Sequence, residues 1–113
     1  VDCIVVFKIS QNKNYDQNQD KFGFLDLTDP NLNMKYIAFG SCMKLRDLNS
    51  FTKKALFTSL KTKTNPKIYI YSIQSEKLIR TIQVETKERI QSAKFNEKGI
   101  LVITKTTFFQ YTI

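Results

Sequence analysis

The chain has 113 residues, of which 42% are hydrophobic, and it carries a formal net charge of +8. Its length is typical of one domain, and no apolar run approaches the roughly 18 residues that a membrane-spanning helix needs. The sequence has no histidine, two cysteines and three glycines, which excludes a Ser-His-Asp triad, a disulfide framework and a glycine-rich phosphate loop. We therefore expect a protein that is not an enzyme and that binds no metal or cofactor.

The compartment is predicted from the cysteines and from the sequons. Two cysteines are read as buried free thiols, and no Asn-x-Ser/Thr acceptor for glycosylation occurs. Both features favour a reducing environment, so a cytoplasmic location is expected. The positive charge favours anionic partners such as nucleic acid or a phosphoinositide surface, or acidic proteins.

The N-terminal third predicts strands separated by polar segments. Residues 3–9, CIVVFKI, have the apolar and β-branched character of a strand. Residues 10–21, SQNKNYDQNQDK, are rich in Asn, Gln and Lys and predict a polar surface loop. Residues 22–41 then predict a strand, a turn at Asp29-Pro30-Asn31 and a second strand.

Residues 42–66 predict a basic insertion between two strands. They contain six Lys or Arg against one Asp, and they lose the alternation expected of a strand. We expect this segment to leave the sheet as a helix or an irregular loop, with a short helix favoured around residues 50–60. If it binds a partner rather than being a solvated loop, the candidate residues are Lys44, Arg46, Lys53, Lys54, Lys61 and Lys63.

The C-terminal half predicts a series of short strands. Residues 67–82, KIYIYSIQSEKLIRTI, predict two strands joined by the polar turn Gln74-Ser75-Glu76-Lys77. Residues 90–95, IQSAKF, and residues 100–105, ILVITK, predict a hairpin whose turn is Asn96-Glu97-Lys98-Gly99. A last strand is expected in TFFQYTI at the C-terminal end.

Two of these strands repeat at an offset of 40 residues. IYIYSI begins at residue 68 and FFQYTI at residue 108, so that Tyr71 aligns with Tyr111 and Ile73 with Ile113. Four short strands at a period near 40 are typical of β-propeller blades. We expect Tyr71 and Tyr111 at equivalent places, each in the third strand of a four-stranded antiparallel unit.

The repeat resembles the WD-repeat family in a degenerate form. Tyr71-Ser72 and Tyr111-Thr112 stand where that family has an aromatic-Asp pair, and Phe95 to Gly99 stands where it has a phrase like F-S-P-D-G. Val84 to Lys87 replaces the Gly-His link. Because the His, the Trp-Asp pair and the turn Asp are absent, the resemblance does not imply the polar network that braces standard repeats.

Within that family, residues 22–103 are most similar to the PROPPIN branch of phosphoinositide-binding propellers. The lipid site of that branch requires two adjacent arginines. The arginines of this chain, Arg46, Arg80 and Arg89, are not adjacent. The resemblance therefore assigns no lipid-binding residue.

The predicted fold is all-β, with about two and a half four-stranded antiparallel propeller-type blades and the basic insertion. A closed propeller needs about four to eight blades, so residues 1–113 are expected to be one β-rich unit of a larger propeller or assembly. The alternative is a small OB-like β-barrel.

Two functions follow from these folds. Propeller blades favour a non-catalytic scaffold whose partners are other protein chains. The barrel favours a basic domain that binds nucleic acid or a phosphoinositide surface, with bases stacked on aromatic rings. The candidate rings for stacking, unless they are core residues, are Phe7, Phe22, Phe24, Tyr36, Tyr69 and Phe109.

Overall fold

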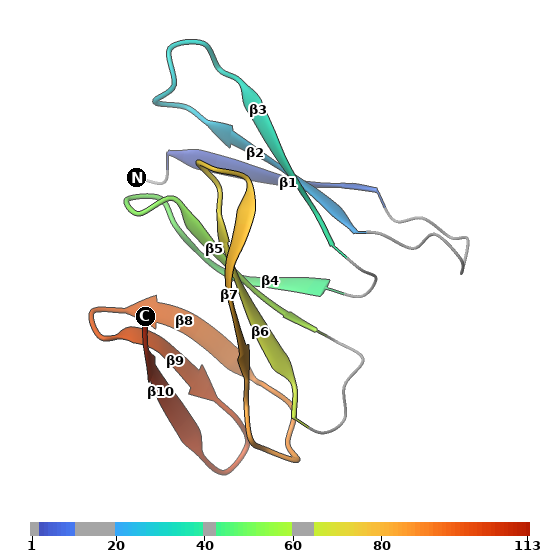
Figure 1. Ribbon diagram of the computed structural model, residues 1–113, viewed down its shortest axis with the longest axis vertical. Coiled ribbons are helices and arrows are strands. Elements are labelled where there is room, and N and C mark those ends of the chain that lie inside the picture. The colour runs from blue at the N-terminus through green and yellow to red at the C-terminus, as the bar shows by residue number, and fades with distance from the viewer. Residues whose placement is uncertain (1–2, 11–19, 40–42, 60–64) are drawn as a thin grey trace.

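The computed structural model of the protein describes residues 3–10, 20–39, 43–59 and 65–113. All the regular secondary structure in these residues is β-strand. The described residues thus contain no apolar helix of the length that a lipid bilayer requires. The ten strands, drawn in Figure 1, are β1 (Ile4–Ser10), β2 (Lys21–Asp26), β3 (Met34–Ala38), β4 (Met43–Asn49), β5 (Lys54–Ser59), β6 (Lys67–Ser72), β7 (Lys77–Gln83), β8 (Ser92–Asn96), β9 (Gly99–Ile103) and β10 (Phe108–Thr112).

These strands form three open antiparallel sheets, in which strands that pair are also consecutive along the chain. We call them the first sheet (β1, β2, β3), the middle sheet (β4, β5, β6, β7) and the third sheet (β8, β9, β10). Figure 1 shows the middle sheet between the other two, with β8 against β4 and β5. The all-β class is confirmed, while only the middle sheet has four described strands.

Strand β5, in the interior of the middle sheet, is buried on both faces. Successive side chains of a strand point to opposite faces, and here Ala55 and Phe57 join one core cluster while Leu56, between them, joins the other. Strand β6 alternates in the same way between Tyr71 and Ile70. The first cluster packs the first sheet on the middle sheet, and the second cluster packs the middle sheet on the third.

The two core clusters differ in chemistry. In the first, the ring of Phe57 lies 4.9 Å from that of Phe22 and 4.2 Å from that of Phe39, measured between centroids. Phe39 in turn lies 4.4 Å from Tyr71. These ring pairs meet at tilted or edge-on angles, so the rings attract one another as well as burying area. In the second cluster the aromatic rings of Phe95, Phe109 and Tyr111 are only partly buried. Its buried members are aliphatic: Leu56, Ile68, Ile70, Ile82, Val84, Ile90, Ala93, Ile100 and Val102.

The middle and third sheets repeat the same register around the two tyrosines. Tyr71 lies on β6, the third strand of the middle sheet, opposite Ala55. Tyr111 lies on β10, the third strand of the third sheet, opposite Ile100. The expected third-strand position is found for both, although the sheet that holds Tyr111 has three described strands instead of four.

The turns that follow β4 and β8 are also built alike. Asn49 is the last residue of β4, and its Oδ1 accepts hydrogen bonds from the N–H groups of Phe51 and Thr52. Asn96 is the last residue of β8, and its Oδ1 accepts from Lys98 and Gly99, at the same two offsets along the chain. Such a side chain closes a turn on its own backbone. The repeat therefore includes the turns that follow the strands, each capped by an asparagine side chain, as well as the strands themselves.

The expectation for residues 42–66 is wrong in its main part. In its described part the segment does not leave the sheet, because residues 43–49 form β4 and residues 54–59 form β5. Residues 42 and 60–64 lie outside the described residues. No helix forms in residues 50–59, the described part of the range expected to be helical, where residues 50–53 are instead the turn between these strands. A strand that is buried on both faces has a continuous apolar run in place of alternation, and the run ALF at residues 55–57 is such a case.

The other predicted elements are confirmed where the structure describes them. Residues 67–82 form the hairpin of β6 and β7, and residues 92–103 form the hairpin of β8 and β9. The turn at residues 29–31 joins β2 to β3. Of the polar loop predicted at residues 10–21, Ser10 and Lys21 pair as the ends of β1 and β2, and residues 11–19 lie outside the described residues.

Candidate functional site

The six basic residues predicted for a partner site do not form one cluster. Lys44 and Arg46 lie on β4, and Lys53 and Lys54 lie at the far end of the β4–β5 hairpin. Lys53 forms an ion pair with Asp26 of the first sheet, which ties its charge to a structural contact. Lys61 and Lys63 lie outside the described residues.

Arg46 occupies an irregularity of β4, where the pairing with β5 skips one residue. Its Nε donates to the buried hydroxyl of Thr58 at 2.7 Å. One terminal nitrogen donates to the carbonyl of Ile90 at 3.1 Å, and the other to the carbonyl of Gln91 at 3.3 Å. A single guanidinium therefore joins β4 and β5 to the segment that leads into β8. Burial lowers the pKa of Arg46 because desolvation disfavours its charged form.

Asp47 completes the contact between the middle and third sheets. Its Oδ2 accepts a hydrogen bond of 2.8 Å from the backbone N–H of Phe95 on β8, and its Oδ1 accepts from Leu48. A bulge in a strand commonly re-aims side chains in this way. Arg46 and Asp47, adjacent in sequence, thus both bond across the gap to the third sheet and its leading segment.

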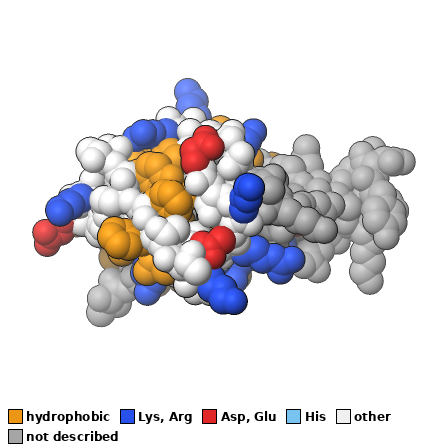
Figure 2. All heavy atoms as spheres, turned by 90° about the horizontal axis from the view of Figure 1, so that it is seen from below, with side chains coloured by type: hydrophobic (Ala, Val, Ile, Leu, Met, Phe, Trp, Pro, Cys, Tyr) orange, Lys and Arg blue, Asp and Glu red, His pale blue; other side chains and the backbone are white. Residues whose placement is uncertain are grey.

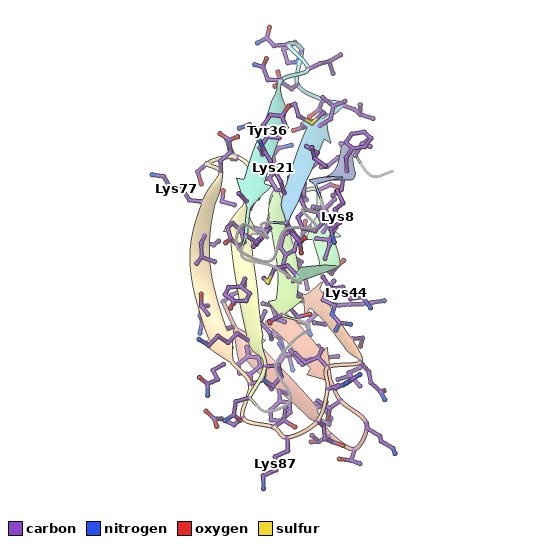
Figure 3. The ribbon with its side chains drawn as sticks, turned by 90° about the vertical axis from the view of Figure 1, so that its right-hand side faces the viewer. Lys8, Lys21, Tyr36, Lys44, Lys77 and Lys87 are labelled. Atoms are coloured by element: carbon purple, nitrogen blue, oxygen red, sulfur yellow. The ribbon has the colours of Figure 1, made fainter. Side chains whose placement is uncertain are left out.

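A hollow lies beside Arg46, at the end of the middle sheet where β5 stops and β6 starts. We call it the basic hollow, and its volume is about 240 Å³. Lys44 and Arg89 line it together with Arg46, and both are exposed. Figure 3 shows Lys44 projecting from β4 at the edge of the molecule. The residues that line the hollow are Lys44, Arg46, Ser59, Pro66, Arg89, Ile90 and Gln91.

Arg89 was not among the predicted site residues. In the sequence it stands 43 positions after Arg46, and its neighbours form no recognisable motif. It reaches the hollow because the backbone of Ile90 and Gln91 is bonded to Arg46. A contact between segments so far apart cannot be predicted from a single sequence. Lys44 and Arg46, in contrast, were predicted as site residues from the local charge of their segment alone.

A second surface of interest is the side of the first sheet that faces away from the middle sheet. Phe22 and Phe24 of β2 point into the first core cluster, so Gly23 between them faces outward. Gly23 pairs with Phe7 on one side and Tyr36 on the other, and these two side chains are each 45% exposed. We call this surface the outer apolar face, and its large side chains are Val5, Phe7, Ile9, Leu25, Met34 and Tyr36.

The outer apolar face is closely packed even though solvent reaches it. A Cβ placed on Gly23 would lie 2.8 Å from Cδ1 of Ile9 and 3.2 Å from Sδ of Met34, so these side chains lean over the glycine from both sides. The ammonium of Lys21 lies 4.6 Å from the centroid of the Tyr36 ring, a favourable cation–π distance. Figure 3 shows Lys21 beside Tyr36 at this face.

The third sheet also exposes apolar side chains on the side away from the core. Ile103 pairs with Phe108, which is 69% exposed, and Leu101 lies beside them in a shallow depression. Figure 2 views the molecule from the side of the third sheet and shows hydrophobic side chains gathered in a central band. Both ends of the three-sheet stack therefore present apolar groups to solvent.

The aromatic residues proposed for base stacking are mostly internal. Phe22 and Phe24 are buried, while Tyr69 and Phe109 pack against the two core clusters. Of the six, only Phe7 and Tyr36 are exposed, and both lie on the outer apolar face.

Among the residues that the structure describes, no group of three His, Cys, Asp or Glu side chains is placed to hold a metal ion. No protein-family model matches the sequence, and neither a curated protein nor a solved structure gives a significant match.

Proposed function

We propose that the chain is a non-catalytic protein-interaction module, a scaffold segment built from WD-like propeller-type sheets, whose partners are other protein chains. The observation that carries the proposal is the outer apolar face, where Phe7 and Tyr36 flank Gly23 on a solvent-facing sheet. Soluble proteins rarely leave such apolar patches uncovered unless they bind something. The occupant that fits is another β-sheet, because the opposite side of this sheet already packs on one.

The propeller-type assignment is supported by the repeated construction of the sheets. The middle and third sheets share the register at Tyr71 and Tyr111 and the turn caps at Asn49 and Asn96. Each sheet packs face to face on the next one along the chain. Units that bury their faces against neighbours in this way need further units or caps at the ends of the array.

The non-catalytic assignment is supported by the use made of the acidic side chains. Asp20 accepts from the backbone of Met43, Asp26 is bonded to Lys53, and Asp47 is bonded to Phe95. Glu88 accepts from the hydroxyls of Thr104 and Thr106. These carboxylates hold segments together, in contrast to the free and mutually close pair that acid–base chemistry requires.

The test compares two substitutions that change the net charge equally. Phe7→Glu places a carboxylate on the outer apolar face, whereas Phe51→Glu places one on a turn residue that is 95% exposed. The unmodified chain is expected to self-associate in size-exclusion chromatography with light scattering and to bind an apolar dye. Phe7→Glu should shift the chain toward the monomer and at least halve dye binding, while Phe51→Glu should behave like the unmodified chain.

A monodisperse monomer with a sharp cooperative melt and little dye binding would contradict the scaffold proposal. That outcome would favour the small basic β-domain and nucleic-acid binding in its place. Affinity for single-stranded nucleic acid that falls steeply with salt would then identify phosphate contacts.

A further inference from the structure

The basic hollow concentrates positive charge. Three of its lining residues, Lys44, Arg46 and Arg89, are cationic, and none of the described residues that line it is Asp or Glu. The ion pairs found in the described part of the chain, Lys8–Asp20 and Lys53–Asp26, lie elsewhere. Like charges gathered in a concave site repel one another and attract an anion.

Arg46 is held in a fixed orientation at this site. A guanidinium has five N–H donors, and those of Arg46 bond to Thr58, Ile90 and Gln91, all of them neutral acceptors. Two N–H groups remain without a bonded acceptor among the described residues. The orientation is thus set by the fold before any ligand arrives, which lowers the entropic cost of binding.

We propose that the basic hollow binds a phosphate group. Arg46 is the preorganised hydrogen-bond donor, and the exposed cations Lys44 and Arg89 balance the negative charge of the phosphate. Guanidinium groups match phosphate oxygens in geometry and form strong charge-assisted bonds with them. The hydroxyl of Ser59, at the end of β5, is a further lining donor. The hollow and the outer apolar face belong to different sheets, so this site is separate from the proposed interaction surface.

The shared chemistry is a phosphate, which is supplied either as the free anion or as a phosphorylated side chain of a partner protein. The probe is radiolabelled inorganic phosphate, and the measurement is equilibrium dialysis against the full chain at neutral pH and low ionic strength. Dialysis counts bound phosphate per chain whatever the state of assembly. Its failure therefore leaves the proposal for the outer apolar face unaffected.

The decisive variant combines Lys44→Ala with Arg89→Ala, since both side chains make no hydrogen bond or ion pair within the described residues. Arg46 is left in place because it also joins the sheets. The matched control combines Lys77→Ala with Lys98→Ala, which removes the same charge. Both lysines are exposed, at the start of β7 and in the turn between β8 and β9, and these ends of the sheets lie away from the basic hollow. Phosphate binding is expected to weaken at least tenfold in the first variant and by less than twofold in the control.

Competition then distinguishes the two sources of phosphate. Displacement of the label by O-phosphoserine at lower concentration than by unlabelled phosphate would assign the site to a phosphorylated side chain, and the reverse order would assign it to the free anion. Equal displacement by serine would overturn the proposal. Absence of saturable binding, or equal weakening in the control variant, would overturn it as well.

Discussion

The side chain of Arg46 has two roles, one in holding the sheets together and one in the basic hollow. Its bonds to Thr58, Ile90 and Gln91 join the middle sheet to the segment before β8. The same geometry leaves part of its charge at the surface of the basic hollow. Because Arg46 stabilises the fold, its substitution would not test phosphate binding alone. The same substitution does test how much the contact between the sheets contributes to stability.

Replacement of Arg46 by Met should destabilise the protein by about 1–3 kcal/mol, because the buried Thr58 hydroxyl and two carbonyl groups lose their charged donor. The control is Arg80→Met, which removes one hydrogen bond at an exposed position, to the carbonyl of Thr112, and should cost at most about 0.5 kcal/mol. Urea unfolding at one fixed protein concentration measures both. Equal losses for the two variants would contradict the role assigned to Arg46.

The Asp26–Lys53 pair predicts a loss of stability in acid. Hydrogen bonds from Lys53 and then Thr28 lower the pKa of Asp26 from 3.8 to about 2. A carboxylate with a lowered pKa in the folded state stabilises that state fully above its unfolded pKa. The contribution is then lost as the pH falls from about 4 through about 2. The melting temperature should therefore decline over this range.

Asp26→Asn should make this decline shallower, without removing it, because hydroxyl donors from Thr106 and Thr104 also lower the pKa of Glu88. Melting curves from pH 6 to pH 2 test the difference. Glu97→Gln serves as the control, since Glu97 is an exposed turn residue that makes no hydrogen bond or ion pair within the described residues. An unchanged slope in Asp26→Asn would refute the assignment.

At the scale of elements, the start of β9 depends on a glycine. Gly99 has φ of +142°, where residues with a Cβ are strained. A Cβ there would also lie 2.1 Å from the carbonyl oxygen of Tyr111 on the paired strand. Gly99→Ala should thus destabilise the third sheet by roughly 1–3 kcal/mol, the usual cost of such backbone strain, or more.

Gly23→Ala is the matched substitution, because the nearest atom to its Cβ is the end of the flexible Ile9 side chain. Its cost should be clearly smaller, as that side chain can move aside. Thermal unfolding of both variants at one protein concentration makes the comparison. A larger loss for Gly23→Ala than for Gly99→Ala would contradict the conformational argument.

Elements with local signals were predicted from the sequence, and elements defined by distant contacts were not. The hairpin at residues 67–82 has alternating strands and a polar turn, so its pattern sufficed. Strand β5 lacked alternation because it is buried on both faces, a property that exists only once the other sheets are in place. Lys44 and Arg46 were selected by local charge, but Arg89 joins them through a fold contact that a sequence pattern does not encode.

At the scale of the molecule, three sheets stack in chain order and the two end sheets expose apolar side chains. The middle sheet has partners on both sides, whereas the first and third sheets have one described partner each. This asymmetry is the structural basis for expecting further protein chains at the ends. It also explains why a chain of ordinary domain length can have well-packed cores and still present Phe7 and Phe108 to solvent.

The difference between the two core clusters determines which sheet packs on which face of the middle sheet. One face of the middle sheet presents Phe57 and Tyr71 to buried aromatic rings, and the other presents Leu56 and Ile70 to a cluster whose buried members are aliphatic. A sheet that docked on the wrong side would meet side chains of another shape and leave voids, which close-packed interiors tolerate poorly. Docking of a sheet on the wrong face of the middle sheet is thus penalised, and the order in which the three sheets stack is encoded in their side chains.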